Sequence, residues 1–165
     1  MDMTSVSLLI AIGDREMTIE MIGGGTWTIP VGPVSLVEGE LERSNRPAPE
    51  QLTNALGIVI DHLDDVVRDS PEMLNAPDVT FTGRHAVSFG RVELGDDALP
   101  ADYIVERRDA DEVFRTLVAE PREERIHNPG LDPDDIETII GVSCVVLAVM
   151  RRLELTQASI ATVVA

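Results

Sequence analysis

The sequence predicts an α/β fold in which helices pack on a sheet, and three observations favour it. The amino-terminal part holds three short β-rich segments that are separated by glycine-containing turns. Residues 49–68 carry apolar side chains at three- and four-residue spacing on an otherwise charged segment, which is typical of an amphipathic helix. Only 3% of residues are aromatic although 44% are hydrophobic, so aliphatic side chains must fill the core. The length of 165 residues suits one well-buried core, and we expect a single domain over residues 1–165.

The first three predicted elements are strands at residues 6–12, 16–22 and 26–31. In the second of them apolar and polar residues alternate, which is the pattern of a half-buried strand. Gly13-Asp14 and Gly23-Gly24-Gly25 connect the strands, and short connections with glycine favour antiparallel hairpins because glycine adopts the positive φ of tight turns. The chain therefore opens as a three-stranded antiparallel meander.

Helices and strands alternate in the remainder of the chain. The stretch Asp132-Pro133-Asp134-Asp135 predicts a helix start, with a capping carboxylate, proline at the first helical position and acids at the positive end of the helix dipole. In chain order we expect a short helix at 34–41, a helix at 49–68, a buried strand at 79–82, a helix at 84–93, an extended or irregular segment at 102–108, a helix at 109–119 that Asp109 caps, a helical turn at 121–127, a long apolar helix at 134–153 and a strand at 160–164. A meander followed by helix, strand, helices and strand matches the ribonuclease H-like unit of actin-like (ASKHA) folds.

The charge of the chain limits its partners. Thirty acidic residues stand against 13 basic ones, all of them arginine, and the net charge is −17 at pH 7. Such a charge repels nucleic acid, polyphosphate and anionic membranes unless arginines gather in one cleft. We therefore expect no nucleic acid and no membrane among the partners.

Cys144 is the single cysteine, which excludes an internal disulfide and a site with several thiolate ligands. It lies on an apolar helix without a basic neighbour within a turn, so we expect an inert core thiol. The apolar run 136–150 is shorter than the ~18 residues of a membrane span, and the first 13 residues lack a basic region before their apolar run. We expect a cytoplasmic protein.

Two stretches carry a resemblance to a known family. Residues 29–36, Ile-Pro-Val-Gly-Pro-Val-Ser-Leu, look like a family stretch "SLPLGAVRL", and residues 129–131, Pro-Gly-Leu, precede Asp134-Asp135-Ile136 and an apolar helix. The chain resembles the second domain of exopolyphosphatases and guanosine pentaphosphate phosphatases (Ppx/GppA). The resemblance implies a cleft between two such domains, with phosphate on glycine-rich turns and a water-orienting glutamate from the first domain. We expect that domain to be missing here.

The resemblance implies a phosphate turn "DIGGGSTEL" between the opening strands, and residues 11–17 match it. Gly13 is kept, Asp14 and Arg15 replace two glycines, and Glu16 replaces serine. Asp14 would repel phosphate and Arg15 could compensate. The three glycines at 23–25 look like such a turn, but they lie too close to residues 29–36 and are interpreted as the next hairpin.

A second family turn, "GVGGTATTLA", is matched by residues 81–89. Gly83 is kept, and Arg84 and His85 stand at the helix start, where backbone N–H groups can hold an anion. The alternative is a helix start with exposed polar side chains. A third family segment, "SDRGLREG", has no counterpart in residues 160–165. The resemblance thus leaves Gly13, Arg15, Gly83, Arg84 and His85 as residual phosphate-binding candidates.

Other constellations are set aside. Helical spacing places Asp61 and Asp65 together while His62 and Asp64 point elsewhere, so a metal site is not expected there. His85, Ser88 and the acids at 96–97 lack a nucleophile elbow. We expect no catalytic residue, no metal site and no cofactor.

The leading hypothesis is a non-catalytic interaction or regulatory module. The alternative is the phosphate- or nucleotide-binding half of a Ppx/GppA-type phosphatase that needs a separate first domain, with Mg²⁺ required only in that case. Apolar residues of the predicted helix 134–153 occupy more of its circumference than one sheet-facing stripe needs. We therefore expect a homodimer, or a protein partner in place of the first domain, unless the helices at 84–93 and 109–119 cover this surplus.

Overall fold

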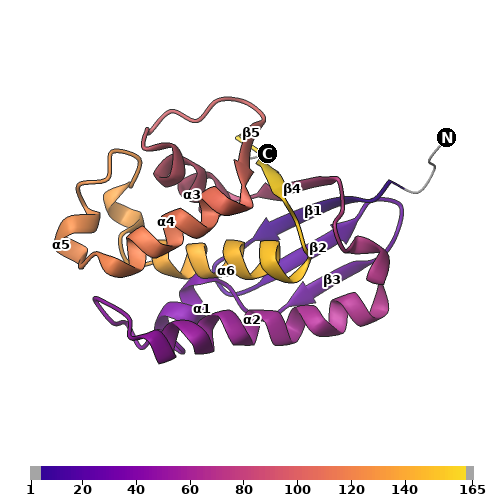
Figure 1. Ribbon diagram of the computed structural model, residues 1–165, viewed down its shortest axis with the longest axis horizontal. Coiled ribbons are helices and arrows are strands. Elements are labelled where there is room, and N and C mark those ends of the chain that lie inside the picture. The colour runs from indigo at the N-terminus through magenta and orange to yellow at the C-terminus, as the bar shows by residue number, and fades with distance from the viewer. Residues whose placement is uncertain (1–4, 163–165) are drawn as a thin grey trace.

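The computed structural model describes residues 5–162, which form a mixed sheet with strand order β3-β2-β1-β4-β6-β5 (Figure 1). The strands are β1 (Ser7–Ile12), β2 (Met17–Met21), β3 (Thr26–Ile29), β4 (Asp78–Thr82), β5 (Tyr103–Glu106) and β6 (Gln157–Ile160). The helices are α1 (Pro33–Glu38), α2 (Pro49–Asp69), α3 (Arg84–Leu94), α4 (Arg107–Ala119), α5 (Arg122–Arg125) and α6 (Ile139–Arg152), with 3-10 turns η1 (Pro71–Met73) and η2 (Pro133–Asp135).

The predicted meander is confirmed. β1 pairs with β2 and β2 with β3, both antiparallel. Gly23 adopts a φ of 78°, and the N–H of Met21 donates to the carbonyl of Gly25 at 2.9 Å. The stretch of three glycines is therefore the β2–β3 hairpin, as interpreted from the sequence.

The central strands run parallel. β4 lies parallel to both β1 and β6, and β5 joins β6 as an antiparallel edge strand. Because β1 and β4 are parallel neighbours, their carboxyl ends meet at one edge of the sheet. The turns that follow these two strands carry the candidate site residues.

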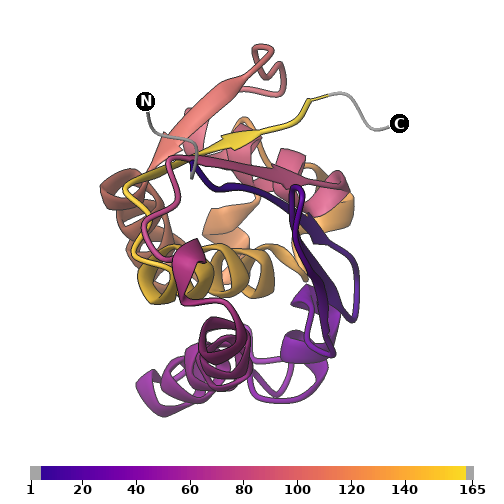
Figure 2. The ribbon, with the colours of Figure 1, turned by 90° about the vertical axis from the view of Figure 1, so that its right-hand side faces the viewer.

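All the larger helices lie on one side of the sheet (Figure 2). On that side Ile10, Ile19 and Phe81 are fully or almost fully buried. On the opposite side Ala11 and Glu20 are exposed. One hydrophobic core therefore fills the space between one face of the sheet and the helices.

Helix α6 is the centre of this core. It packs against α1, α2, α3 and α4, and every residue from 139 to 150 is buried. The apolar surplus is thus covered within the chain, and the expectation that it marks a dimer surface was wrong. A homodimer stays a prediction without that support. No helix among residues 5–162 is long and apolar enough to cross a bilayer.

The predicted boundaries of four elements need correction. β6 ends at Ile160, where the predicted strand 160–164 begins, and residues 163–164 lie outside the described part. The sequence Gln-Ala-Ser-Ile did not predict this strand because four residues with two buried side chains, Ala158 and Ile160, are too short to show a period. The segment 102–108 contains the regular strand β5, and α4 begins at Arg107 rather than after Asp109. The acidic helix start at 132–135 forms only the 3-10 turn η2, in which Asp132 caps Asp134, and α6 begins at Ile139.

Candidate functional site

Two turns converge at the carboxyl ends of β1 and β4. One turn comprises Gly13–Glu16, closed by the N–H of Gly13 donating to Glu16 O at 2.9 Å. The other comprises Gly83–His85, where Gly83 has a φ of 102° and a side chain would lie 2.9 Å from the carbonyl oxygen of Ile12. We call these two segments together the turn corner. Glycine is required at 83 because of both its dihedral angle and this close approach.

His85 joins the two turns. Its ring is 2% exposed, and Nε2 lies 2.7 Å from Oδ1 of Asp14. Nδ1 of the same ring is buried without a hydrogen-bond partner among the described residues. The hydrogen bond from His85 holds the pKa of Asp14 below its ordinary value, and nearby arginines add to the effect. His85 therefore fixes an ionised carboxylate in the turn corner.

The backbone of Asp14 is fixed as well. Its carbonyl oxygen accepts the N–H of Val34 at 2.9 Å. A side chain at Gly32 would lie 2.5 Å from the same oxygen, so only glycine allows this approach. The start of α1 thus contacts the β1–β2 turn closely and fixes its backbone.

Arg84 is paired across the turn corner with Asp135 of η2. Ser88, one turn along α3, donates from Oγ to the other oxygen of Asp135 at 3.1 Å. Asp135 is buried, whereas the Arg84 side chain is 59% exposed. The hydroxyl of Ser88 is thus hydrogen-bonded to the carboxylate of Asp135.

Arg15 is paired with Glu38 at the end of α1. Two hydrogen bonds of 2.5 and 3.1 Å join its guanidinium to both carboxylate oxygens. This pairing lowers the pKa of Glu38, and Arg43 also contributes by a 3.1 Å contact. The Arg15 side chain is 61% exposed, so the pair contributes little to stability.

The structure therefore brings the five predicted site residues to one corner but pairs their cations internally. Sequence reasoning identified Asp14 as a repelling group and missed the two carboxylates that bind the arginines, Glu38 and Asp135. The excess of acidic over basic residues was a signal for such pairing, though without positions. Each basic group predicted to contact an anion already contacts a carboxylate.

Two of the acidic residues on α2 that the sequence analysis set aside are paired with arginines. Asp64 pairs with Arg152 and Asp65 with Arg68 on α2. Among residues 5–162 no three His, Cys, Asp or Glu side chains are grouped so that they could hold a metal ion. Cys144 is buried within α6.

Asp14→Asn is expected to remove a pH-dependent part of the stability. The folded pKa of Asp14 lies below its ordinary value of 3.8, so the ionised form favours folding above that value. The contribution is lost as the pH falls through the folded pKa. Because the Asp14 side chain is 66% exposed, we expect less than ~1 kcal/mol. Urea unfolding over a pH series measures the difference between wild type and variant.

The control for this series is Asp61→Asn, on the exposed side of α2. It tests whether removal of any surface carboxylate changes the profile. Two results would contradict the prediction. The difference in unfolding free energy between wild type and Asp14→Asn could stay constant far below pH 3.8, or it could equal the difference found for Asp61→Asn.

Comparison with solved structures places the fold. The chain superposes on an exopolyphosphatase-like protein with a TM-score of 0.82 at 16% identity, over 94% of this chain and 55% of that one. It matches a Ppx/GppA phosphatase of Aquifex aeolicus with a TM-score of 0.81 at 13% identity, over 95% and 53%. It matches an exopolyphosphatase of Cytophaga hutchinsonii with a TM-score of 0.72 at 12% identity, over 95% and 53%.

These matches confirm the predicted ribonuclease H-like fold and its likeness to Ppx/GppA proteins. The chain spans about half the length of the structures that it matches, which agrees with the predicted resemblance to one of two domains. No family model matches the sequence, and no curated protein matches it significantly.

Proposed function

We propose that this chain is a non-catalytic, exopolyphosphatase-like module that acts through contacts with a protein partner or a second copy. The observation that supports the proposal is the internal pairing of the turn corner. Asp14 lies 2.7 Å from His85, and Glu38 and Asp135 bind the two arginines. A phosphate entering the corner would have to displace carboxylates held within the fold and meet the negative charge of Asp14.

A second candidate function is the phosphate- or nucleotide-binding half of a phosphatase that a separate chain completes. It is favoured by the convergence of the two turns and by the exposed side chains of Arg15 and Arg84. Exposed ion pairs contribute only ~0–1 kcal/mol, so a strong anion can replace the carboxylate partner. Under this candidate the contacts are Arg15, Arg84 and His85, with Mg²⁺ accompanying the substrate.

The purified chain is expected to release no phosphate from polyphosphate, guanosine pentaphosphate or ATP, with or without Mg²⁺. The reason is that the turn corner offers carboxylates where an anionic substrate needs free hydrogen-bond donors. A phosphate-release assay on the chain measures this directly.

The variants Arg15→Ala and Arg84→Ala are the controls for this assay. Phosphate release that either variant abolishes would overturn the proposed function, whereas release that neither changes comes from a contaminant. Thermal-shift measurements with ATP and pyrophosphate add a binding test, since a ligand of the folded state raises the melting temperature. If Arg84→Ala removes the rise in melting temperature, the second candidate function is supported. If the rise persists in this variant, the ligand binds outside the turn corner.

A further inference from the structure

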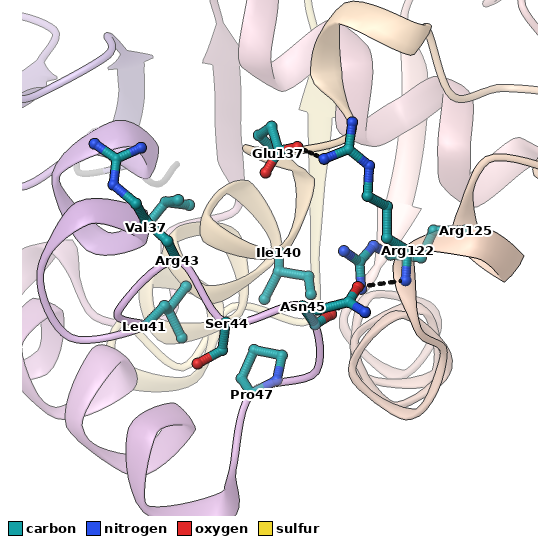
Figure 3. Close-up of a pocket in the computed structure, with 10 residues that line it drawn as sticks. All are labelled: Val37, Leu41, Arg43, Ser44, Asn45, Pro47, Arg122, Arg125, Glu137 and Ile140. Atoms are coloured by element: carbon teal, nitrogen blue, oxygen red, sulfur yellow. Dashed lines mark hydrogen bonds and ion pairs between the residues drawn. The ribbon is translucent and has the colours of Figure 1, made fainter.

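A small cavity lies beside the carboxyl-terminal end of α1. It is formed by the segment that links α1 to α2, by α5 and by the residues around the start of α6 (Figure 3). Its volume is about 100 Å³. The share of one water in the liquid is about 30 Å³ and drug-sized ligands need some 300 Å³ or more, so the cavity suits an ion or a single small group.

The buried guanidinium of Arg125 forms part of the cavity wall. Arg125 is 4% exposed, and Nη1 donates to the carbonyls of Asn45 and Glu120 at 2.9 and 2.8 Å. Nε is buried without a hydrogen-bond partner among residues 5–162, and no carboxylate of these residues forms an ion pair with the guanidinium. Buried charges in proteins are normally paired, because desolvation penalises them. Arg125 thus carries a buried positive charge without a direct ion pair among the described residues.

Burial is the dominant influence on the ionisation of Arg125 and lowers its pKa, and the charge of Arg122 acts in the same direction. The negative charges of Glu120 and Glu123 oppose this lowering of the pKa. An anion bound in the cavity would stabilise the charged guanidinium and oppose the lowering of its pKa.

The other charged groups of the cavity reinforce this reading. Arg43 and Arg122 line it together with Glu137, so three positive charges stand against one negative charge in a protein of net charge −17. Arg122 is paired with Glu137 and Arg43 with Glu38, and all four side chains are at least partly exposed. Figure 3 shows Arg122 and Arg125 beside Asn45. Exposed pairs of this kind exchange partners at little cost.

We propose that this cavity binds a small doubly charged oxyanion, a phosphate or sulfate group, with Arg125 as the buried contact and Arg122 as the contact at the mouth. The guanidinium group suits the site because its planar donors match the oxygens of such anions. Ser44 and Asn45 also line the cavity, where the Ser44 hydroxyl donates to Oε1 of Gln51 and Oδ1 of Asn45 accepts the backbone N–H of Arg122. No residue of the turn corner lines the cavity, although Glu38 links the two by pairing with both Arg15 and Arg43.

Isothermal titration of the full chain with inorganic phosphate tests the proposal, at constant ionic strength set by chloride. Arg122→Gln is expected to weaken binding about tenfold, which corresponds to about 1.4 kcal/mol, because the anion loses a charge-assisted hydrogen bond. Glu137→Gln is expected to strengthen binding severalfold, because it frees Arg122 and removes the negative charge of the wall. If the only role of Arg125 were to stabilise the α1–α2 segment, Glu137→Gln would not increase the affinity for phosphate.

The control variants are Arg115→Gln and Glu20→Gln, which remove exposed charges elsewhere, and both should bind phosphate as wild type does. Arg125→Met should abolish binding, and the variants of Arg122 and Glu137 decide the matter if Arg125→Met does not fold. Titration with AMP distinguishes a free phosphate from one carried by a larger molecule.

Absence of phosphate binding at millimolar concentration overturns this site and leaves the proposed function intact. Binding that Arg84→Gln removes and Arg122→Gln does not would place the anion in the turn corner. That result would overturn both this site and the proposed function.

Discussion

Gly141→Ala is expected to destabilise the fold by up to about 2 kcal/mol, because overpacking a tight contact costs roughly 1–3 kcal/mol and exceeds the helix propensity that alanine adds. Gly141 lies on α6 where this helix crosses α1. A methyl group at this position would lie 2.5 Å from the carbonyl oxygen of Pro33 and 3.1 Å from its Cα. These are backbone atoms, so no side-chain rotation relieves the clash and the two helices must separate. The gain in helix propensity from alanine, about 1 kcal/mol, offsets only part of this cost.

The matched control is Gly57→Ala on α2. Gly57 is also inside a helix, but a methyl group there meets nothing within 4 Å. This change should therefore stabilise the protein by about 0.5–1 kcal/mol through helix propensity alone. Denaturant unfolding of both variants gives the two differences, and the expected signs are opposite. A change of the same sign in both would contradict the tight α1–α6 crossing.

Much of the fold was predictable because its signals are local. Apolar spacing over 49–68 predicted α2, and glycine turns predicted the meander. Both signals depend only on residues that are close together in the sequence. The surroundings of α6 were not predictable in this way. Its sequence is apolar on all sides, which predicts that the helix is covered but does not identify the covering elements. The four helices that cover it come from distant parts of the chain.

The candidate site was also predictable only in its local features. The parallel pairing of β1 and β4 brings Gly13 and Gly83 together, and their turns were found from the sequence. The pairing of Arg15 with Glu38 and of Arg84 with Asp135 spans 23 and 51 positions, so no local pattern shows it.

The cavity at Arg125 was missed for a related reason. In the sequence Arg122-Glu123-Glu124-Arg125 reads as an exposed, charge-balanced turn. In the structure Arg125 is buried and donates hydrogen bonds to the backbone carbonyls of Asn45 and Glu120. Burial of a single charged side chain depends on tertiary packing, which periodicity does not report.

Cys144 is expected to react with an aromatic disulfide reagent at least ~10³-fold more slowly in the folded protein than in the unfolded chain. The thiolate is the reactive form, and burial raises the pKa of the Cys144 thiol to about 12. The side chain is also inaccessible within α6. Reaction therefore requires α6 to leave the core, and unfolding free energies of 5 kcal/mol or more make such opening rarer than ~1 in 10³. Because the chain has one cysteine, the signal reports this position alone.

The same reaction connects α6 to the stability of the whole domain. If α6 opens only when the domain unfolds, Gly141→Ala should accelerate labelling of Cys144 about tenfold for each ~1.4 kcal/mol that it removes from the unfolding free energy. Gly57→Ala should slow labelling by the corresponding factor. The rates are followed by absorbance under native conditions, and the unfolding free energies come from the denaturant curves of the same variants. Fast labelling of the wild type, or rates that do not follow these free energies, would show that α6 opens locally, and the four-helix enclosure would then not be the cooperative centre of the fold.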